Sequence, residues 1–175
     1  PLSMNGSKMT SEREELLNKC SKIIFNSEWS KNRFLTKLSE IYIKSPKLIV
    51  IKQSADTQNI NINKKKKIIT FVGKLNRAKG YDVFGSAIID ILNDNTDWSA
   101  IVIGDEEREK LEFNHERLNL LGFKNHDEVI KIFKKTSISV VCSRWEEPFG
   151  RTSLESASCG CAVIITNRGG LPETI

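Results

Sequence analysis

Short apolar runs alternate with amphipathic stretches along most of the chain. Runs typical of buried strands occupy residues 23–25, 47–52, 68–72, 100–103, 118–121, 138–142 and 161–165. Between residues 83 and 92, apolar side chains recur at i, i+1, i+4, i+5, i+8 and i+9, which is one face of a helix. The pattern predicts further helices over residues 11–20, 29–38, 106–112, 125–133 and 151–158. Ser11 with Glu14, and Asn125 with Glu128, have the spacing of N-terminal capping boxes.

Short apolar strands that alternate with helices predict β-α units around a parallel sheet. Continuous apolar strands are typical of burial on both faces. We therefore predict an α/β fold with a Rossmann-like parallel sheet flanked by helices. Ligands of such sheets bind outside the carboxyl ends of the strands. The loops after Val72, Ile103, Leu121, Cys142 and Ile165 are thus the functional candidates.

A polar stretch from Gln53 to Lys67, with four consecutive lysines, separates two structural units. We interpret the lysines as a solvated entrance to the next strand. No aromatic side chains are interleaved with them, as a nucleic-acid surface would require. The net charge of +5 permits phosphate ligands, nucleic acid or an anionic membrane surface, and selects none of them.

Length and composition narrow the class of protein. The 175 residues suit one domain, or one domain and part of a second. The longest apolar run, Cys161 to Ile165, is far below the ~20 residues of a membrane helix. The first residues contain no apolar h-region, so we expect neither a spanning segment nor a signal peptide. The four cysteines show no C-x-x-C spacing, so we expect no metal site but buried free thiols in a reducing cytoplasm.

Three of the candidate loops carry groups suited to a phosphorylated, hydroxylated ligand. Residues 73–80 hold three cations just before a helix, where a helix N-terminus and cations favour phosphate. After Cys142, Pro148 pushes Glu147 into an extended conformation, and Gly150 opens a helix that contains Glu155. Two carboxylates eight residues apart could grip separate hydroxylated parts of one ligand. A third loop, residues 167–173, has two glycines that suit a close approach of backbone to ligand.

Each of these features also has a simpler interpretation. Residues 73–80 and 167–173 could be ordinary solvated turns. Glu147 could be a loop carboxylate stabilised by the dipole of the following helix, and Glu155 could be a surface residue of that helix. The residue pattern alone leaves both interpretations open.

Five stretches carry a resemblance to a known family: FVGKLNRAKG, IVIGDEE, LGFKNHDEV, EEPFGRTSLESASCGCAVI and GGLPE. The chain resembles the retaining, nucleotide-sugar-dependent glycosyltransferases of the GT-B fold, family 4, the group 1 type. The stretches occur in the family's order and spacing, strongly over residues 68–175 and weakly over residues 20–56. The E-x7-E element, from Glu147 to Glu155, is the most diagnostic part.

The resemblance implies a partial GT-B fold with three segments. Residues 1–56 would be the end of the N-terminal, acceptor-side domain, and residues 57–67 a linker. Residues 68–175 would be the donor-binding domain, which we expect to be truncated. Most of the acceptor domain would then precede Pro1, and we expect little transferase activity from the fragment alone.

The resemblance also implies roles at matching positions. Three residues would act in catalysis: Lys74 and Lys79 would hold the donor diphosphate, and Glu147 would bind hydroxyls of the donor sugar. Lys74 stands where the family commonly has Arg, so it keeps the charge but lacks the bidentate fork.

Five further residues would bind the donor. Gly73 opens the phosphate loop, and Phe149 and Gly150 would offer backbone amides to the sugar. Thr152 would contact the phosphate, and Glu155 would accept hydrogen bonds from the ribose hydroxyls.

The implied function is transfer of a sugar from a nucleoside-diphosphate sugar to a glycan, lipid or other hydroxyl acceptor, with no cofactor and no metal. We expect a cytoplasmic protein with no nucleic-acid partner, and peripheral contact with a membrane is left open. Two alternatives stay open at this stage. One is an epimerase or phosphorylase of the same architecture, although no pyridoxal-binding lysine site is recognisable. The other is a non-enzymatic basic module that binds nucleic acid or a membrane surface.

Overall fold

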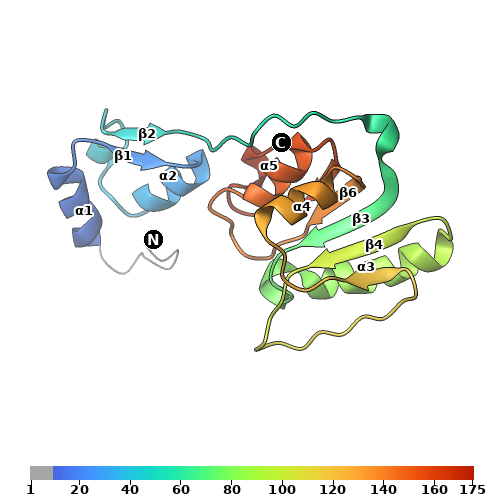
Figure 1. Cartoon of the computed structure of the whole chain (residues 1–175). Coiled ribbons are helices and arrows are strands. Elements are labelled where there is room, and N and C mark those ends of the chain that lie inside the picture. Colours follow the sequence, from blue (N-terminus) through green and yellow to red (C-terminus); the bar gives the residue numbers. More distant parts are fainter. Residues whose placement is uncertain (1–9) are drawn as a thin grey trace. The chain divides into compact units, whose positions relative to one another are not determined.

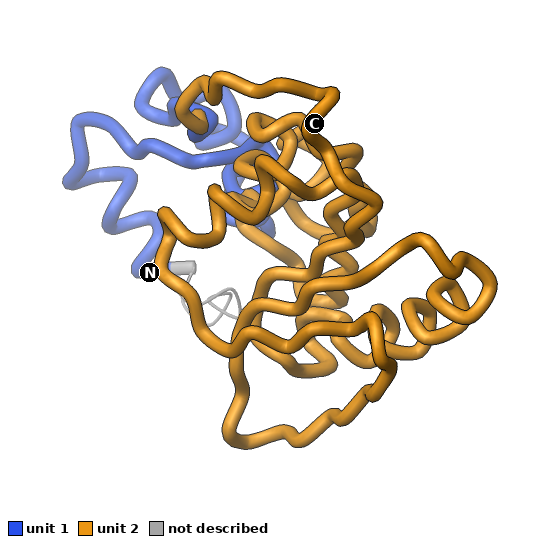
Figure 2. The backbone as a smooth tube through the Cα atoms, turned by 45° about the vertical axis from the view of Figure 1, so that its right-hand side comes forward, with its two compact units in different colours: residues 1–53 blue, residues 54–175 orange. Residues whose placement is uncertain are grey.

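The computed structural model describes residues 10–175. The chain divides into two compact units, with the boundary between Gln53 and Ser54. Figure 2 shows the two units in different colours. The boundary falls at the start of the polar stretch that the sequence indicated.

Within residues 10–53, the first unit contains two α-helices and a two-stranded parallel sheet. Its elements are α1 (Thr10–Lys19), β1 (Ile23–Phe25), α2 (Glu28–Leu35), the 3-10 turn Glu40–Tyr42 and β2 (Leu48–Val50). The core is an apolar cluster of Leu17, Phe25, Phe34, Leu35 and Leu38. Ser11 lies inside α1 rather than before it, so the predicted cap at Ser11 was wrong. At α2 the cap is Ser27, whose hydroxyl accepts from the Ser30 amide at 2.9 Å.

The second unit is built on a five-stranded, wholly parallel sheet. Its elements are β3 (Lys66–Val72), α3 (Tyr81–Asp94), β4 (Ser99–Ile103), β5 (Leu118–Leu120), α4 (His126–Phe133), β6 (Thr136–Val141), α5 (Arg151–Ser158) and β7 (Ala162–Ile165). Three short 3-10 turns lie at Ile62–Lys64, Arg77–Lys79 and Leu171–Glu173. The strand order is β5-β4-β3-β6-β7. The order reverses direction between β3 and β6, which is where ligands bind in open parallel sheets.

Helices cover both faces of this sheet, as the apolar strands predicted. Figure 1 shows α3 on one side and α4 and α5 on the other. On the α3 side, Phe71 packs against Tyr81 and Phe84 with ring centroids 5.4 and 5.2 Å apart. On the other side, Ile103 joins Phe133 and cysteines of the α5–β7 segment in a second apolar cluster. The predicted α/β class with a flanked parallel sheet is therefore confirmed.

The predicted helix over residues 106–112 is absent. Residues 104–117 form an irregular loop between β4 and β5. Its acidic side chains also bind another loop: Glu106 accepts from Asn76 at 2.9 Å, and Glu109 accepts from the Arg77 amide at 3.0 Å. Phe113 packs edge-on against Tyr81, 5.5 Å away. These tertiary contacts override a modest helical propensity.

One lysine of the basic run is not solvated. Lys65 is half-buried, and its ammonium donates to the carbonyls of Phe133, Thr136 and Cys159 at 2.8, 2.7 and 2.6 Å. The Phe133 and Cys159 carbonyls lie at the C-terminal ends of α4 and α5, where unpaired oxygens favour a cation, and the Thr136 carbonyl lies at the start of β6. The interpretation of the whole run as a solvated entrance was therefore wrong for Lys65 and right for exposed Lys64, Lys66 and Lys67.

Candidate functional site

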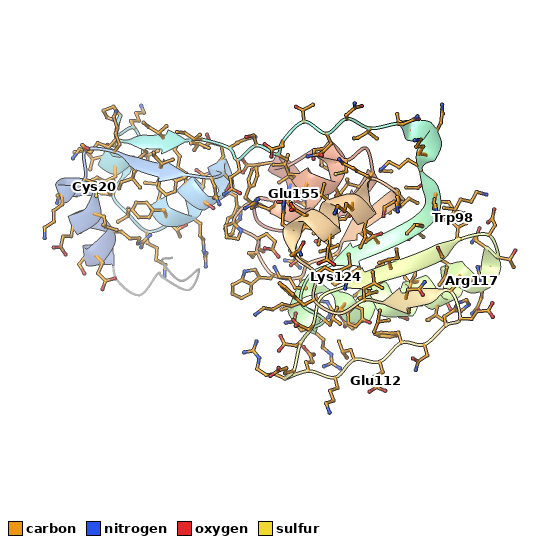
Figure 3. All side chains as sticks on the ribbon, viewed as in Figure 1. Cys20, Trp98, Glu112, Arg117, Lys124 and Glu155 are labelled. Carbon is orange, nitrogen blue, oxygen red and sulfur yellow. The ribbon has the colours of Figure 1, made fainter. Side chains whose placement is uncertain are left out.

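Three loops at the carboxyl edge of the sheet form the candidate site. They are the β3 loop (residues 73–80), the β6 loop (residues 142–150) and the β7 loop (residues 166–173). Because β3, β6 and β7 are neighbours in the sheet, their loops emerge side by side. Figure 3 shows the two ends of the sheet, with Trp98 and Arg117 just before β4 and β5, and Lys124 after β5.

The β3 loop is shaped by Asn76. Its side-chain oxygen accepts from the Lys79 amide at 3.0 Å, which caps the short 3-10 turn before α3. The Asn76 amide group in turn donates to Glu106 at 2.9 Å. Hydrogen bonds from Arg108 and then from Asn76 lower the pKa of Glu106 from 4.5 to about 2. Glu106 is thus a carboxylate across the physiological range, and it fixes the residue that orients the Lys79 backbone.

The β3 and β6 loops are joined by backbone contacts. The Ala78 carbonyl accepts from the amides of Arg144 and Trp145 at 2.9 and 3.0 Å. Gly80 has φ +75°, and a Cβ atom there would lie 2.0 Å from the Cys142 carbonyl oxygen. Only glycine allows this approach, which brings the start of α3 against the end of β6.

Lys79 and Glu147 meet across this junction. The Lys79 ammonium forms an ion pair with Oε1 of Glu147, although the two residues are 68 positions apart. The Glu147 side chain is only 14% exposed. The same Oε1 atom accepts a hydrogen bond of 2.9 Å from the hydroxyl of Ser143. Two residues predicted to act on one ligand are therefore adjacent.

The β7 loop closes over the β6 loop through its glycines. The Gly170 amide donates to the Glu147 carbonyl, and the Gly169 amide donates to Oε2 of Glu146, both at 2.6 Å. Gly169 has φ +59°, and a Cβ atom there would lie 2.1 Å from the Glu147 carbonyl oxygen. The predicted close approach at these glycines is to the protein's own backbone, and it holds the Glu147 backbone in place.

The start of α5 presents unpaired amides to the same edge. Gly150 caps the helix with φ +116°, and the preceding Phe149 is buried. Within residues 10–175, the amides of Phe149 and Gly150 donate no hydrogen bond, and the Thr152 hydroxyl has no partner. Amides at a helix N-terminus attract anions.

Glu155 lies one turn further along α5, as Figure 3 shows. Its Oε1 atom is 2.8 Å from the Arg151 guanidinium and 3.4 Å from Nε2 of His126 in α4. The side chain is 14% exposed, so it is not the freely solvated helix residue of the simpler interpretation. Glu147 and Glu155 share no hydrogen bond or common partner among the described residues, which fits separate tasks.

Lys74 and Gly73 differ from the rest of the predicted set. Lys74 is exposed and has no ion-pair partner within residues 10–175. Gly73 donates its amide to the Ile103 carbonyl at 3.0 Å, and its own carbonyl lies 1.8 Å from where a Cβ atom of Gly104 would be. Gly73 therefore shapes the backbone between β3 and β4, and the Lys74 side chain is open to solvent.

Three residues of the site were not found from the sequence. Asn76 could have been, because Asn before a helical turn is a preferred N-cap. Ser143 and Glu146 gave no signal: nothing in the sequence distinguishes Ser143 from other serines, and Glu146 binds Gly169 of a loop that approaches only in the folded chain. Within the described part of the chain, no cluster of His, Cys, Asp and Glu could hold a metal ion, and no helix is both long and apolar enough to cross a membrane.

Comparison with known proteins identifies the family. The family described as "Glycosyl transferases group 1" matches residues 52–175, which is more than half of the chain. The chain belongs to this family. The group 1 match contains all three loops of the site.

Curated group 1 relatives are considerably longer. Spore coat protein SA of Bacillus subtilis (strain 168) is 31% identical over 123 residues, which are 63% of this chain and 33% of that protein. D-inositol 3-phosphate glycosyltransferase of Corynebacterium jeikeium (strain K411) is 30% identical over 123 residues, 62% of this chain and 29% of that protein. The chain spans about a third of the length of these relatives.

Solved structures share the fold. Anabaena Alr3699/HepE in complex with UDP-glucose has a TM-score of 0.71 at 19% identity, over 92% of this chain and 49% of that one. The C-terminal domain of LpcC, a group 1 family protein from Francisella tularensis, has a TM-score of 0.55 at 28% identity, over 63% of this chain and 64% of that one. The Rossmann-like α/β fold of GT-B glycosyltransferases, predicted from the sequence, is confirmed.

Proposed function

We propose that this chain is the donor-binding part of a retaining glycosyltransferase that takes its sugar from a nucleoside-diphosphate sugar. The observation that carries the proposal is the meeting of Lys79 and Glu147 near the unpaired Phe149 and Gly150 amides that precede α5, at the point where the strand order reverses. An ammonium and helix amides suit a diphosphate, and a carboxylate suits sugar hydroxyls. The complexes of Alr3699/HepE with UDP-glucose, and with UDP and glucose, support a ligand of this class.

The reaction requires the nucleoside diphosphate to leave the anomeric carbon, so negative charge grows on the β-phosphate. The Lys79 ammonium and the amides at Gly150–Thr152 supply fixed positive charge at this edge. Lys74, open to solvent on the same loop, adds a second ammonium. This electrostatic stabilisation would lower the barrier to departure of the nucleoside diphosphate.

We assign Glu147 to the sugar and Glu155 to the ribose. In this assignment Glu147 orients the sugar while the acceptor hydroxyl attacks from the face that the leaving group departs from, which retains configuration. The bond from the anomeric carbon to the diphosphate breaks, and the departing β-phosphate oxygen takes the proton of the hydroxyl. Glu147 is held by an ion pair with Lys79, which suits a positioning carboxylate more than a covalent nucleophile. The acceptor would be a glycan, lipid or other hydroxyl compound, bound largely outside this chain.

Residues 68–175 would supply the donor site, and residues 1–56 would belong to the acceptor-side domain. The whole protein would perform the transfer, because the chain spans only part of its relatives.

Titration calorimetry of the chain tests the proposal. The chain is titrated with UDP, GDP and ADP, and then with UDP-glucose, GDP-mannose and ADP-glucose. We expect one nucleoside diphosphate to bind in preference to the others, and its sugar conjugate to bind more tightly. Absence of binding by all six ligands to the folded chain would refute the proposed function.

A further inference from the structure

Ser143 is a buried serine at the edge of the candidate site. It lies two residues beyond the end of β6 and is 1% exposed. Its backbone is fixed, because its carbonyl accepts a hydrogen bond of 2.5 Å from the Thr166 hydroxyl in the β7 loop. Its side chain therefore projects from a rigid position toward the junction of the β3 and β6 loops.

The Ser143 hydroxyl has three acceptors within reach. They are Oε1 of Glu147 at 2.9 Å, and the carbonyls of Ala78 and Trp145, both at 3.2 Å. A hydroxyl has a single proton to donate, and an ionised carboxylate is a stronger acceptor than a neutral carbonyl. The Ala78 carbonyl already accepts two backbone amides. The proton is therefore directed to Glu147.

The two carboxylate oxygens of Glu147 are consequently different. Oε1 receives both the Lys79 ammonium and the Ser143 hydroxyl. Oε2 has no partner among residues 10–175. Two donors on one oxygen, approaching from two loops, fix the rotation of the carboxylate and leave the other oxygen for a ligand.

We propose that Ser143 is a positioning residue for sugar binding. It holds the Glu147 carboxylate so that Oε2 accepts from a hydroxyl of the donor sugar, while the Lys79 ammonium keeps its other two N–H groups for the diphosphate. This inference rests on the proposed function. It also predicts that Ser143 contributes to recognition of the sugar and not of the nucleotide.

The chain contains a matched control in the strand that precedes Ser143. Ser139, in β6, is also fully buried, but its hydroxyl has no hydrogen-bond partner among residues 10–175. Changing either serine to Ala removes one buried oxygen. Only Ser143→Ala removes a hydrogen bond to Glu147.

The experiment is titration calorimetry of four chains, wild type, Ser143→Ala, Ser143→Cys and Ser139→Ala, with the preferred nucleoside diphosphate and its sugar conjugate. The measured quantity is the ratio of the two dissociation constants, that is, the gain in affinity from the attached sugar. In Ser143→Ala we expect the diphosphate affinity to change by less than about twofold, and the gain from the sugar to fall by about tenfold, as for a lost charged hydrogen bond. In Ser143→Cys, which keeps a weak donor, the gain in affinity from the sugar should lie between the values for wild type and Ser143→Ala. Ser139→Ala should leave the diphosphate affinity and the gain from the sugar unchanged.

Four outcomes would overturn the inference. An undiminished gain from the sugar in Ser143→Ala would show that Ser143 does not orient Glu147. An equal loss of affinity in Ser143→Ala for the diphosphate and for its sugar conjugate would show that Ser143 has a structural role only. If the Ser143→Ala chain does not fold, Ser143→Cys gives the same test. A wild-type chain that binds none of the six ligands would refute the proposed function, and this inference with it. A wild-type chain that binds the diphosphate without gain from the sugar would refute this inference alone.

Discussion

At the scale of single residues, the two lysines of the β3 loop offer a direct contrast. Lys79 is held beside Glu147 by an ion pair and by the Asn76 cap, whereas Lys74 is exposed without a partner in the described part of the chain. We expect Lys79→Ala to weaken binding of the nucleoside diphosphate by about tenfold or more, because a charged hydrogen bond contributes roughly 1.5–3 kcal/mol. Lys74→Arg should be tolerated or tighten binding slightly, since a guanidinium grips an oxyanion with two bonds. Calorimetry measures both, and normal affinity in Lys79→Ala would exclude this loop from the phosphate site.

Glu155 permits a separate test of nucleotide recognition. Its Oε1 atom is engaged by Arg151 and lies near His126, which leaves Oε2 for ribose hydroxyls. Glu155→Ala should weaken diphosphate binding by about tenfold or more, since a charged hydrogen bond is lost. Glu116→Ala, which changes an exposed carboxylate at the opposite end of the sheet, is the control and should bind normally. Unchanged affinity in a folded Glu155→Ala chain would remove Glu155 from the ribose site.

The sequence predicted the residue types of the site better than their surroundings. The spacing of Glu147 and Glu155 and the lysines before α3 were visible in the chain, and the fold brings Lys79 and Glu147 together. The anchoring of Glu147 was not predictable as a whole: Ser143 is only four residues away, but Lys79 is 68 residues away and reaches Glu147 only because the two loops touch. Local spacing carries no information about such contacts.

At the scale of elements, Lys65 links the ends of two helices and gives a stability prediction. Lys65→Met keeps most of the stem but removes the cation from the carbonyls of Phe133 at the end of α4, Cys159 at the end of α5 and Thr136 at the start of β6. We expect a loss of roughly 1.5–3 kcal/mol in the free energy of unfolding, the usual range for hydrogen bonds to a charged group. Urea unfolding measures the loss.

Lys64→Met is the matched control for that measurement, because Lys64 is the exposed neighbour in the same lysine run. Its free energy of unfolding should stay within about 0.5 kcal/mol of wild type. Equal stabilities of the Lys65→Met and Lys64→Met chains would show that the ammonium does not tie the helices together.

Regular elements followed from the periodicity, and irregular ones did not. The capping box at Asn125 and Glu128 is present, with both reciprocal hydrogen bonds. The predicted helix over residues 106–112 does not form, because acidic side chains of this segment bind the β3 loop and Phe113 packs on α3. Helical propensity cannot anticipate such contacts. The same principle explains Lys65, whose sequence neighbours are solvated while its own partners lie 68 to 94 residues away.

At the scale of the whole molecule, protonation of Glu106 makes the free energy of unfolding depend on pH. Its folded-state pKa of about 2 lies below the ordinary value of 4.5, so its contribution is complete above pH 4.5 and is lost as the pH falls toward 2. We expect the free energy of unfolding of wild type to fall more steeply than that of Glu106→Gln between pH 5 and 2. Urea unfolding at several pH values measures both, with Glu107→Gln, an exposed neighbour, as control. Parallel curves for Glu106→Gln and wild type would contradict the assigned pKa.

The central claim is that Glu147 binds the sugar and Glu155 binds the ribose. Calorimetry of Glu147→Ala tests this claim most directly. Removing Glu147 frees the Lys79 ammonium from its ion pair, so affinity for the nucleoside diphosphate should stay close to that of wild type. The gain in affinity from the attached sugar should disappear, because Oε2 no longer accepts from it. An equal loss of affinity for the nucleoside diphosphate and for its sugar conjugate would contradict the account, since Glu147 would then serve the phosphates or the fold.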